Sequence, residues 1–137
     1  MCAGGEISSA KAYLIAPPHV KSLPDMSQVR GWFAILYYQH HVYVFGGFYA
    51  PWHFTKRCER FDLRAEQWKP LPDMSAVRSS FNACRWKEVI FVAGGWENPE
   101  VEYMDLQTET FHTLSQSGSD FSYFVLGCGR PTNDCSE

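Results

Sequence analysis

Leu23-Pro-Asp-Met-Ser-Gln-Val-Arg30 recurs 48 residues later as Leu71-Pro-Asp-Met-Ser-Ala-Val-Arg78, with a single difference in eight positions. A glycine pair follows each copy at the same distance, Gly46-Gly47 after the first and Gly94-Gly95 after the second. Self-similarity at a fixed period of roughly 20–50 residues is the sequence signature of a repeat architecture. The fold of this chain is therefore expected to be built from one structural unit used at least twice.

The spacing between the copies changes after the glycine pairs. Glu59-Arg-Phe-Asp-Leu63 aligns with Glu102-Tyr-Met-Asp-Leu106, and Trp68 with Phe111, at an offset of 43 residues instead of 48. Insertions and deletions collect in surface loops. The pattern therefore predicts a surface loop after each glycine pair, and the loop of the first copy is the longer one.

Each unit is predicted to contain four short strands. In the first copy these lie near 31–38, at 41–45, up to Leu63 and from Trp68 onward. The strand at 41–45 is apolar on both faces, as expected where neighbouring layers cover both sides. Glycine has no Cβ, so the glycine pairs permit another backbone to approach closely. An aromatic content of 16% also favours pleated strands.

An arginine, an apolar strand ending in Gly-Gly, an aromatic-Asp-Leu element and a tryptophan six residues after that aspartate resemble the kelch repeat. The resemblance is weaker in the second copy, where Met104 and Phe111 replace Phe61 and Trp68. It implies an all-β fold, a partial kelch-type β-propeller with two four-stranded antiparallel blades and single strands of the neighbouring blades. The glycine pairs, Trp68 and Phe111 would be structural positions of the repeat.

The repeat divides the chain into five segments. Residues 1–19 are expected to form a poorly ordered extension and 20–29 the last strand of a preceding blade with its linker. The two repeats are then 30–77 and 78–120, and 121–137 contains the start of a third blade and a turn-rich tail. Closed propellers have about four to eight blades, and two blades leave apolar faces uncovered. We therefore expect a fragment of a longer protein, self-association that closes a ring, or a truncated product with little stable structure.

Charge and composition exclude several functions. The net charge is −3 and the basic residues are dispersed, so the clustered footprint of nucleic-acid binding and the basic face of a membrane-seeking helix are missing. The five cysteines form no metal-like spacing, and no signal peptide is recognised. These features predict free thiols and a cytoplasmic or nuclear location, without nucleic-acid or membrane partners.

The sequence contains no recognisable nucleophile motif, phosphate-binding loop or metal-ligand motif. We therefore expect a non-catalytic protein–protein interaction module without cofactor or metal. The resemblance implies the substrate-recognition propeller of a ubiquitin ligase adaptor, or an actin-associated cytoskeletal scaffold. The alternatives are a fragment of a kelch-type propeller enzyme (oxidoreductase, epimerase or specifier protein) and a truncated product without independent function.

Five residues are candidates for partner binding. The resemblance implies that Arg30 and Arg78 line the channel mouth and bind a partner carboxylate, so that alanine there would weaken binding and leave the fold intact. The alternative is that these arginines bond loop carbonyls within the repeat. Tyr49, Trp52 and Trp96 follow the glycine pairs, and exposed aromatic rings are typical interface hot spots; other rings of the first loop could instead pack back onto the blade.

Overall fold

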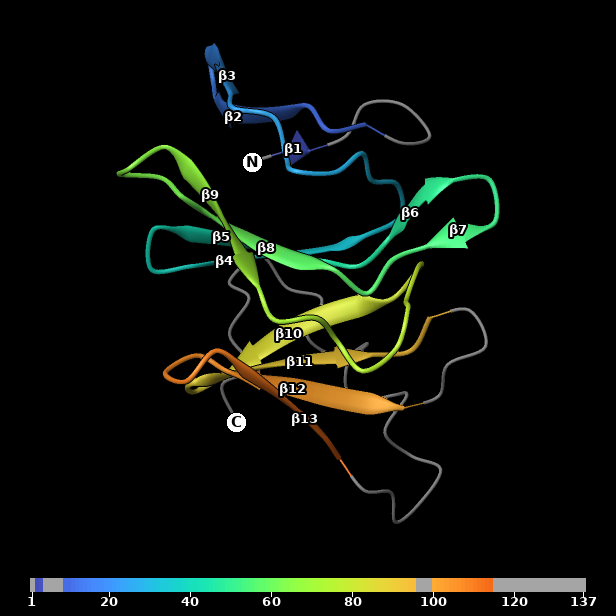
Figure 1. Cartoon of the computed structure of the whole chain (residues 1–137). Coiled ribbons are helices and arrows are strands. Elements are labelled where there is room, and N and C mark those ends of the chain that lie inside the picture. The colour runs from blue at the N-terminus through green and yellow to red at the C-terminus, as the bar shows by residue number, and fades with distance from the viewer. Residues whose placement is uncertain (1, 4–8, 96–99, 115–137) are drawn as a thin grey trace.

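The computed structural model describes residues 2–3, 9–95 and 100–114, which form antiparallel sheets and no helix. Three of the sheets lie one above another, each facing the next (Figure 1). The N-terminal sheet has the order β1-β2-β3, the first blade β4-β5-β8-β9 and the second blade β10-β11-β12-β13. The fold is a partial propeller with two complete four-stranded blades, as the repeat predicts.

The strands of the N-terminal sheet are β1 (Cys2–Ala3), β2 (Ala12–Ala16) and β3 (His19–Leu23). The first blade consists of β4 (Ala34–Tyr38), β5 (His41–Phe45), β8 (Cys58–Asp62) and β9 (Gln67–Leu71). The second blade consists of β10 (Asn82–Trp86), β11 (Val89–Ala93), β12 (Val101–Asp105) and β13 (Thr110–Thr113). A small separate hairpin, β6 (Phe48–Ala50) and β7 (His53–Phe54), follows the first glycine pair.

Burial on both faces explains the continuous apolar run of β5. Val42 and Val44 pack with residues of the N-terminal sheet in one core cluster. Tyr43 and Phe45 point the other way, into a second cluster shared with the second blade. Side chains alternate between the faces of a strand, so a strand between two layers needs apolar residues at every position. The predicted coverage of this strand on both sides is confirmed.

The N-terminal sheet differs from the expectation of a poorly ordered extension and a single strand. β2 pairs antiparallel with β3 along its whole length, from Ala12 opposite Leu23 to Ala16 opposite His19. Ala12 of β2 and Leu23 of β3 are buried against the first blade and join the core cluster, and Leu14 packs against it. The apolar stretch 12–16 is thus the third strand of the preceding unit. The predicted first strand of a third blade, within 121–137, lies outside the described residues.

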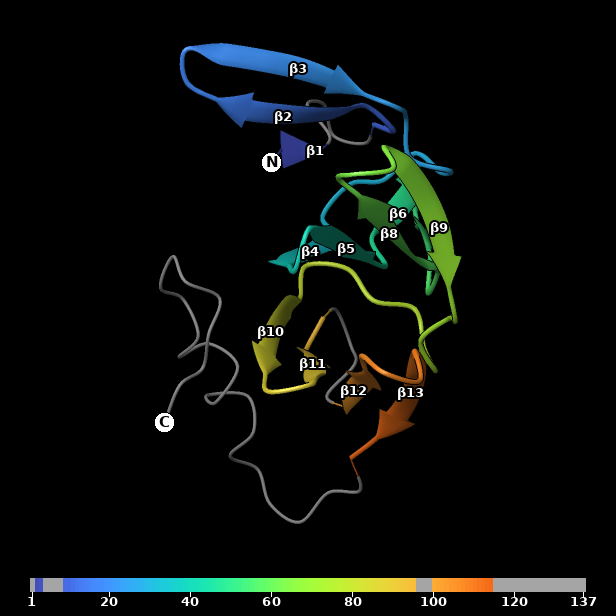
Figure 2. The same cartoon turned by 90° about the vertical axis from the view of Figure 1, so that its left-hand side faces the viewer.

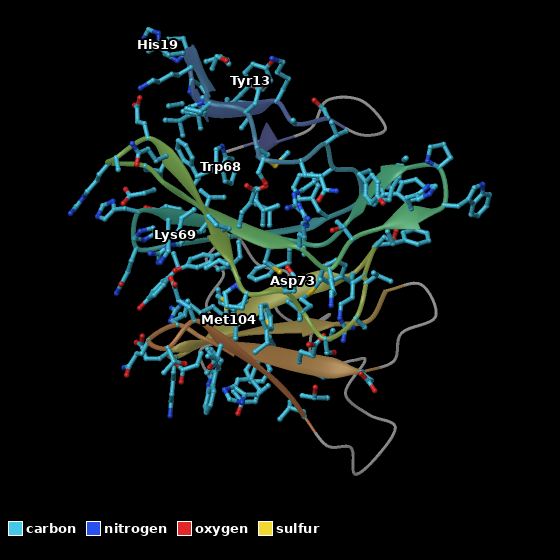
Figure 3. The ribbon with its side chains drawn as sticks, in the orientation of Figure 1. Tyr13, His19, Trp68, Lys69, Asp73 and Met104 are labelled. Carbon is cyan, nitrogen blue, oxygen red and sulfur yellow. The ribbon has the colours of Figure 1, made fainter. Side chains whose placement is uncertain are left out.

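The three sheets fan out from one another, with the N-terminal sheet at one end of the stack (Figure 2). Side-chain contacts connect the layers. Trp68 lies between the N-terminal sheet and the first blade (Figure 3). Its ring packs against Phe61 in a tilted arrangement with 5.0 Å between centroids, and its Nε1 donates to the Pro24 carbonyl at 2.8 Å. Phe111 packs against the cluster between the two blades. The two residues predicted as structural positions of the repeat therefore occupy matching interfaces.

Candidate functional site

Arg30 and Arg78 lie in the interior of the blades. Arg30 Nη1 donates to the carbonyl oxygens of Gly46 and Arg57 at 2.7 and 2.9 Å. Its Nε and Nη2 donate to one oxygen of Glu59 at 3.2 and 3.1 Å. Arg78 repeats this arrangement with the Gly94 carbonyl at 2.8 Å and with Glu102.

The assignment of these arginines to a partner-binding site is therefore corrected. Both side chains are 0% exposed, and in the described structure neither guanidinium is accessible to a partner. The alternative reading, in which each arginine bonds loop carbonyls of its own repeat, describes the observed contacts. The sequence contains the missing signal, because Glu59 and Glu102 recur at equivalent positions and supply a buried carboxylate for each arginine.

The first glycine pair permits the close packing at this point. A Cβ on Gly46 would lie 2.7 Å from the Arg78 carbonyl oxygen, and one on Gly47 2.6 Å from the Gly31 carbonyl oxygen. Both glycines also have positive φ, which side chains disfavour. In the second pair, a Cβ on Gly94 would meet no described residue within 4 Å, and one on Gly95 would meet the Ser79 carbonyl oxygen at 3.1 Å. Among the described residues, the closest approaches are therefore at the first glycine pair.

The β6–β7 hairpin projects from the end of the first blade opposite the β4–β5 turn (Figure 1). Its base is tied to the blade by Gly31 and Phe48, which exchange two backbone hydrogen bonds of 2.8 and 2.9 Å. Phe48 is buried, whereas Tyr49 is 40% and Trp52 81% exposed. The Tyr49 ring lies against His53 in a tilted arrangement with 5.6 Å between ring centroids. The structure thus places two of the predicted aromatic contact residues on one exposed hairpin.

Trp32 is a further exposed aromatic residue beside this hairpin, and it was not among the contact residues predicted from the sequence. It lies 5.1 Å from Phe48 between ring centroids and is 61% exposed. Its backbone is left-handed with φ of 48°, and its carbonyl accepts a 2.9 Å hydrogen bond from the Ser80 amide. A non-glycine residue in this conformation costs about 1–3 kcal/mol. A backbone hydrogen bond therefore holds Trp32 in a strained conformation that leaves its ring largely exposed.

Comparison of the two repeats shows that the backbone turn at Trp32 does not require an indole ring. The position equivalent to Trp32 in the second repeat is Ser80, which has nearly the same φ, 53°. The backbone turn thus forms with a small polar side chain, and the indole ring is not needed to make it. This contrast between the repeats was the sequence signal for an additional contact residue. Trp96, the remaining predicted contact residue, lies outside the described residues.

The described part of the chain offers little reactive chemistry. Burial raises the pKa of the Cys58 thiol to about 12 and also raises that of Cys84, which leaves both as weak nucleophiles. Within residues 2–3, 9–95 and 100–114, no group of three or more His, Cys, Asp or Glu residues is arranged to hold a metal ion. Over the same residues, no helix is long and apolar enough to cross a membrane.

Comparison with known proteins supports the repeat assignment. Residues 33–75 match the family model described as the kelch motif. This range begins just before β4 and ends just after β9, so it coincides with the first blade. A comparison with curated proteins found no match.

Proposed function

The chain carries a kelch motif in a partial β-propeller, and from this premise we propose that it is a non-catalytic protein-binding module. Its contact surface is the aromatic surface formed by Trp32, Tyr49 and Trp52. The proposal rests on the environment of Trp32. Its ring is largely exposed, its backbone is left-handed, and the equivalent residue of the second repeat, Ser80, adopts the same backbone conformation. A tryptophan that neither packs in the core nor shapes the turn is best explained by what it contacts.

The composition of the surface agrees with this role. Tryptophan and tyrosine are enriched among interface hot spots because they bury a large area with few rotatable bonds. Trp32 and the hairpin are held by backbone hydrogen bonds at Gly31, Phe48 and Ser80, so little conformational entropy is lost on binding. Phe48, buried beneath Trp32, supports the ring from below.

The wider biological role follows from the kelch resemblance alone. We propose substrate recognition in a ubiquitin ligase adaptor, or cytoskeletal scaffolding, in the cytoplasm or nucleus. The free thiols of Cys58 and Cys84 are compatible with such a reducing compartment. The identity of the protein that binds this chain would discriminate between the two roles. Stoichiometric metal in the purified chain would instead favour the alternative of a propeller enzyme fragment.

Site-specific photocrosslinking tests the surface. A photoreactive phenylalanine analogue at position 52 is expected to capture a defined partner in cells, whereas the same analogue at Tyr37, exposed elsewhere on the first blade, should not. The affinity of the purified partner is then measured for two variants. Trp52→Ala and Trp32→Ser should each weaken binding about tenfold or more, as expected when a hot-spot residue is truncated.

Trp32→Ser is the sharper of the two variants, because Ser80 shows that serine is accommodated in this conformation. Trp86→Ala is the matched control, since Trp86 is an exposed ring on the β10–β11 turn of the other blade. Equal affinity of the wild type, Trp32→Ser and Trp52→Ala for the captured partner would refute the proposed surface.

A further inference from the structure

At both ends of the stack formed by residues 2–3, 9–95 and 100–114, one sheet face that is used for packing elsewhere has no described sheet against it. Counted back from the shared leucines Leu23 and Leu71, the cross-strand pair Ile15–Val20 takes the place of Phe61–Trp68. Phe61 faces the preceding sheet and is fully buried there. Ile15 and Val20 are 44% and 65% exposed, and Tyr13 on the same face is also exposed. Figure 3 shows Tyr13 on this outermost sheet. We call Tyr13, Ile15 and Val20 the N-terminal face.

At the other end of the stack, the second blade has a face that corresponds to the one used by the first blade to contact the next sheet. In the first blade, the cross-strand row Tyr43, Arg60 and Lys69 faces the second blade. The equivalent row in the second blade is Phe91, Tyr103 and His112, which points away from the first blade. Its rings lie 5.9 and 5.1 Å apart between successive centroids; Phe91 and Tyr103 are half-buried and His112 is exposed. We call this row the C-terminal face.

A repeated ion pair joins each sheet to the next. Lys21 on β3 pairs with Glu66, which lies in the β8–β9 turn of the following sheet. Lys69, the equivalent residue on β9, pairs with Glu109 in the β12–β13 turn at 3.0 Å. Glu109 also accepts from Arg60 at 2.7 Å. Each sheet thus offers a lysine from its last strand to a glutamate in the last turn of the next sheet.

Both members of this ion pair are replaced at the N-terminal and C-terminal faces. The lysine position of the second blade is occupied by His112, and the glutamate position of the N-terminal sheet by Pro18. Contact between these two faces would therefore bury neither an unpaired lysine nor an unpaired glutamate. Pro18, Ile15 and Val20 would instead meet the Phe91–Tyr103–His112 ring row, an apolar match. This joint replacement makes the two faces compatible with each other.

We propose that two copies of this chain associate head to tail, the N-terminal face of each copy packing on the C-terminal face of the other. Such a contact repeats the packing already present between the sheets of one copy. Contacts of this kind form a ring when the rotation between copies closes. The described residues of each copy form three stacked sheets, one of three strands and two of four. Two copies therefore bring six such sheets, within the range of about four to eight blades in closed propellers.

Light scattering behind a sizing column tests the association. The wild type should elute as a folded species of twice the monomer mass. Val20→Asp and His112→Asp each place a charge on one face at an exposed position, so each variant alone should be monomeric with an unchanged circular dichroism spectrum. Trp52→Ala is the control, because its hairpin belongs to neither face, and should leave the dimer intact.

Mixing the two variants distinguishes head-to-tail contact from other dimers. Each variant retains the face that the other has lost, so an equimolar mixture should recover a weaker dimer through one intact contact. The proposal would be overturned by a monomeric wild type, by masses that rise beyond the dimer with concentration, by variants as dimeric as the wild type, or by a mixture that stays monomeric. None of these outcomes bears on binding through Trp32 and Trp52.

A second variant rebuilds the missing ion pair across the contact. Pro18→Glu combined with His112→Lys restores the residue types found at every internal junction. The dimer dissociation constant is then expected to fall a few-fold at low salt and to return toward the wild-type value at high salt. Either substitution alone should not strengthen the dimer. Equal strengthening by the single and double variants would contradict the proposed register of the two faces.

Discussion

Arg30 and Glu59 form an ion pair that is sealed from solvent in the first blade, with side-chain exposures of 0% and 2%. The second oxygen of Glu59 accepts the Ser27 amide at 3.1 Å. The carboxylate therefore joins the Leu-Pro-Asp-Met-Ser segment to β8, while the guanidinium holds the carbonyl of Gly46. The arginine of the repeated motif and the backbone amide of Ser27 are thus both used for folding.

Removing Arg30 should therefore destabilise the fold. Arg30→Ala leaves the Glu59 carboxylate and the Gly46 carbonyl without their donor in the interior. Breaking a buried ion pair by deleting one partner typically costs about 3–5 kcal/mol. We expect a loss of this order in the free energy of unfolding, measured by urea denaturation. Arg57→Ala is the control, because the Arg57 side chain is exposed; a similar small loss for both variants would show that the buried pair contributes little.

The two glycine pairs provide a second test. Gly46→Ala places a Cβ 2.7 Å from the Arg78 carbonyl oxygen, whereas a Cβ at Gly94 meets no described residue within 4 Å. Both positions have positive φ, so both substitutions carry the backbone strain of about 1–2 kcal/mol. Gly46→Ala should therefore lower the midpoint of thermal unfolding by clearly more than Gly94→Ala. Equal shifts would mean that the contact between the glycine and the next repeat is readily relaxed.

The repeat itself made the blades predictable from sequence. The strand at His41–Phe45 and its burial on both faces follow from an apolar run that ends at Gly46, and the match between copies fixes the register. The role of the arginines was harder to predict. An arginine next to a loop is expected to be exposed. The burial of Arg30 becomes evident only from its pairing with Glu59, which lies 29 residues away in the sequence.

Two further features escaped prediction for different physical reasons. The strand Ala12–Ala16 has no second copy in register because its turn to β3 is shorter than the corresponding β8–β9 turn. Its strand character comes from packing against the first blade, which local sequence does not report. Trp32 was missed because exposure and φ are tertiary properties, although its replacement by Ser80 in the second repeat was visible.

The buried thiol of Cys58 makes the fold sensitive to alkaline pH. Burial raises its pKa to about 12 in the folded chain, against about 8.5 for a free cysteine. The unfolded chain therefore loses the thiol proton first, and this contribution to stability is complete below about pH 8.5 and declines toward pH 12. We expect the free energy of unfolding to fall over this window, and less steeply in Cys58→Ala. Identical slopes for both proteins would show that the thiolate is not excluded from the fold.

The turns that close the last two strands of each blade depend on one aspartate oxygen. Asp62 Oδ1 accepts the amides of Arg64 and Ala65 at 2.8 and 3.1 Å, and Asp105 repeats this in the second blade. These amide donors lower the pKa of both carboxyl groups. The stability they contribute is present above the ordinary aspartate pKa and is lost as pH falls through the lowered folded value.

Asp62→Asn keeps an acceptor oxygen for the same two amides, whereas Asp62→Ala removes it. We expect the alanine variant to be less stable than the wild type at pH 7, with asparagine in between, because both aspartate and asparagine side chains can cap such a turn. Toward pH 2 the wild type and the asparagine variant should converge, since the protonated carboxyl group loses its charge but retains its carbonyl oxygen. Urea denaturation at the two pH values measures this. A wild type that keeps its full advantage over Asp62→Asn at pH 2 would show that the charge of Asp62 does not act through these turn amides.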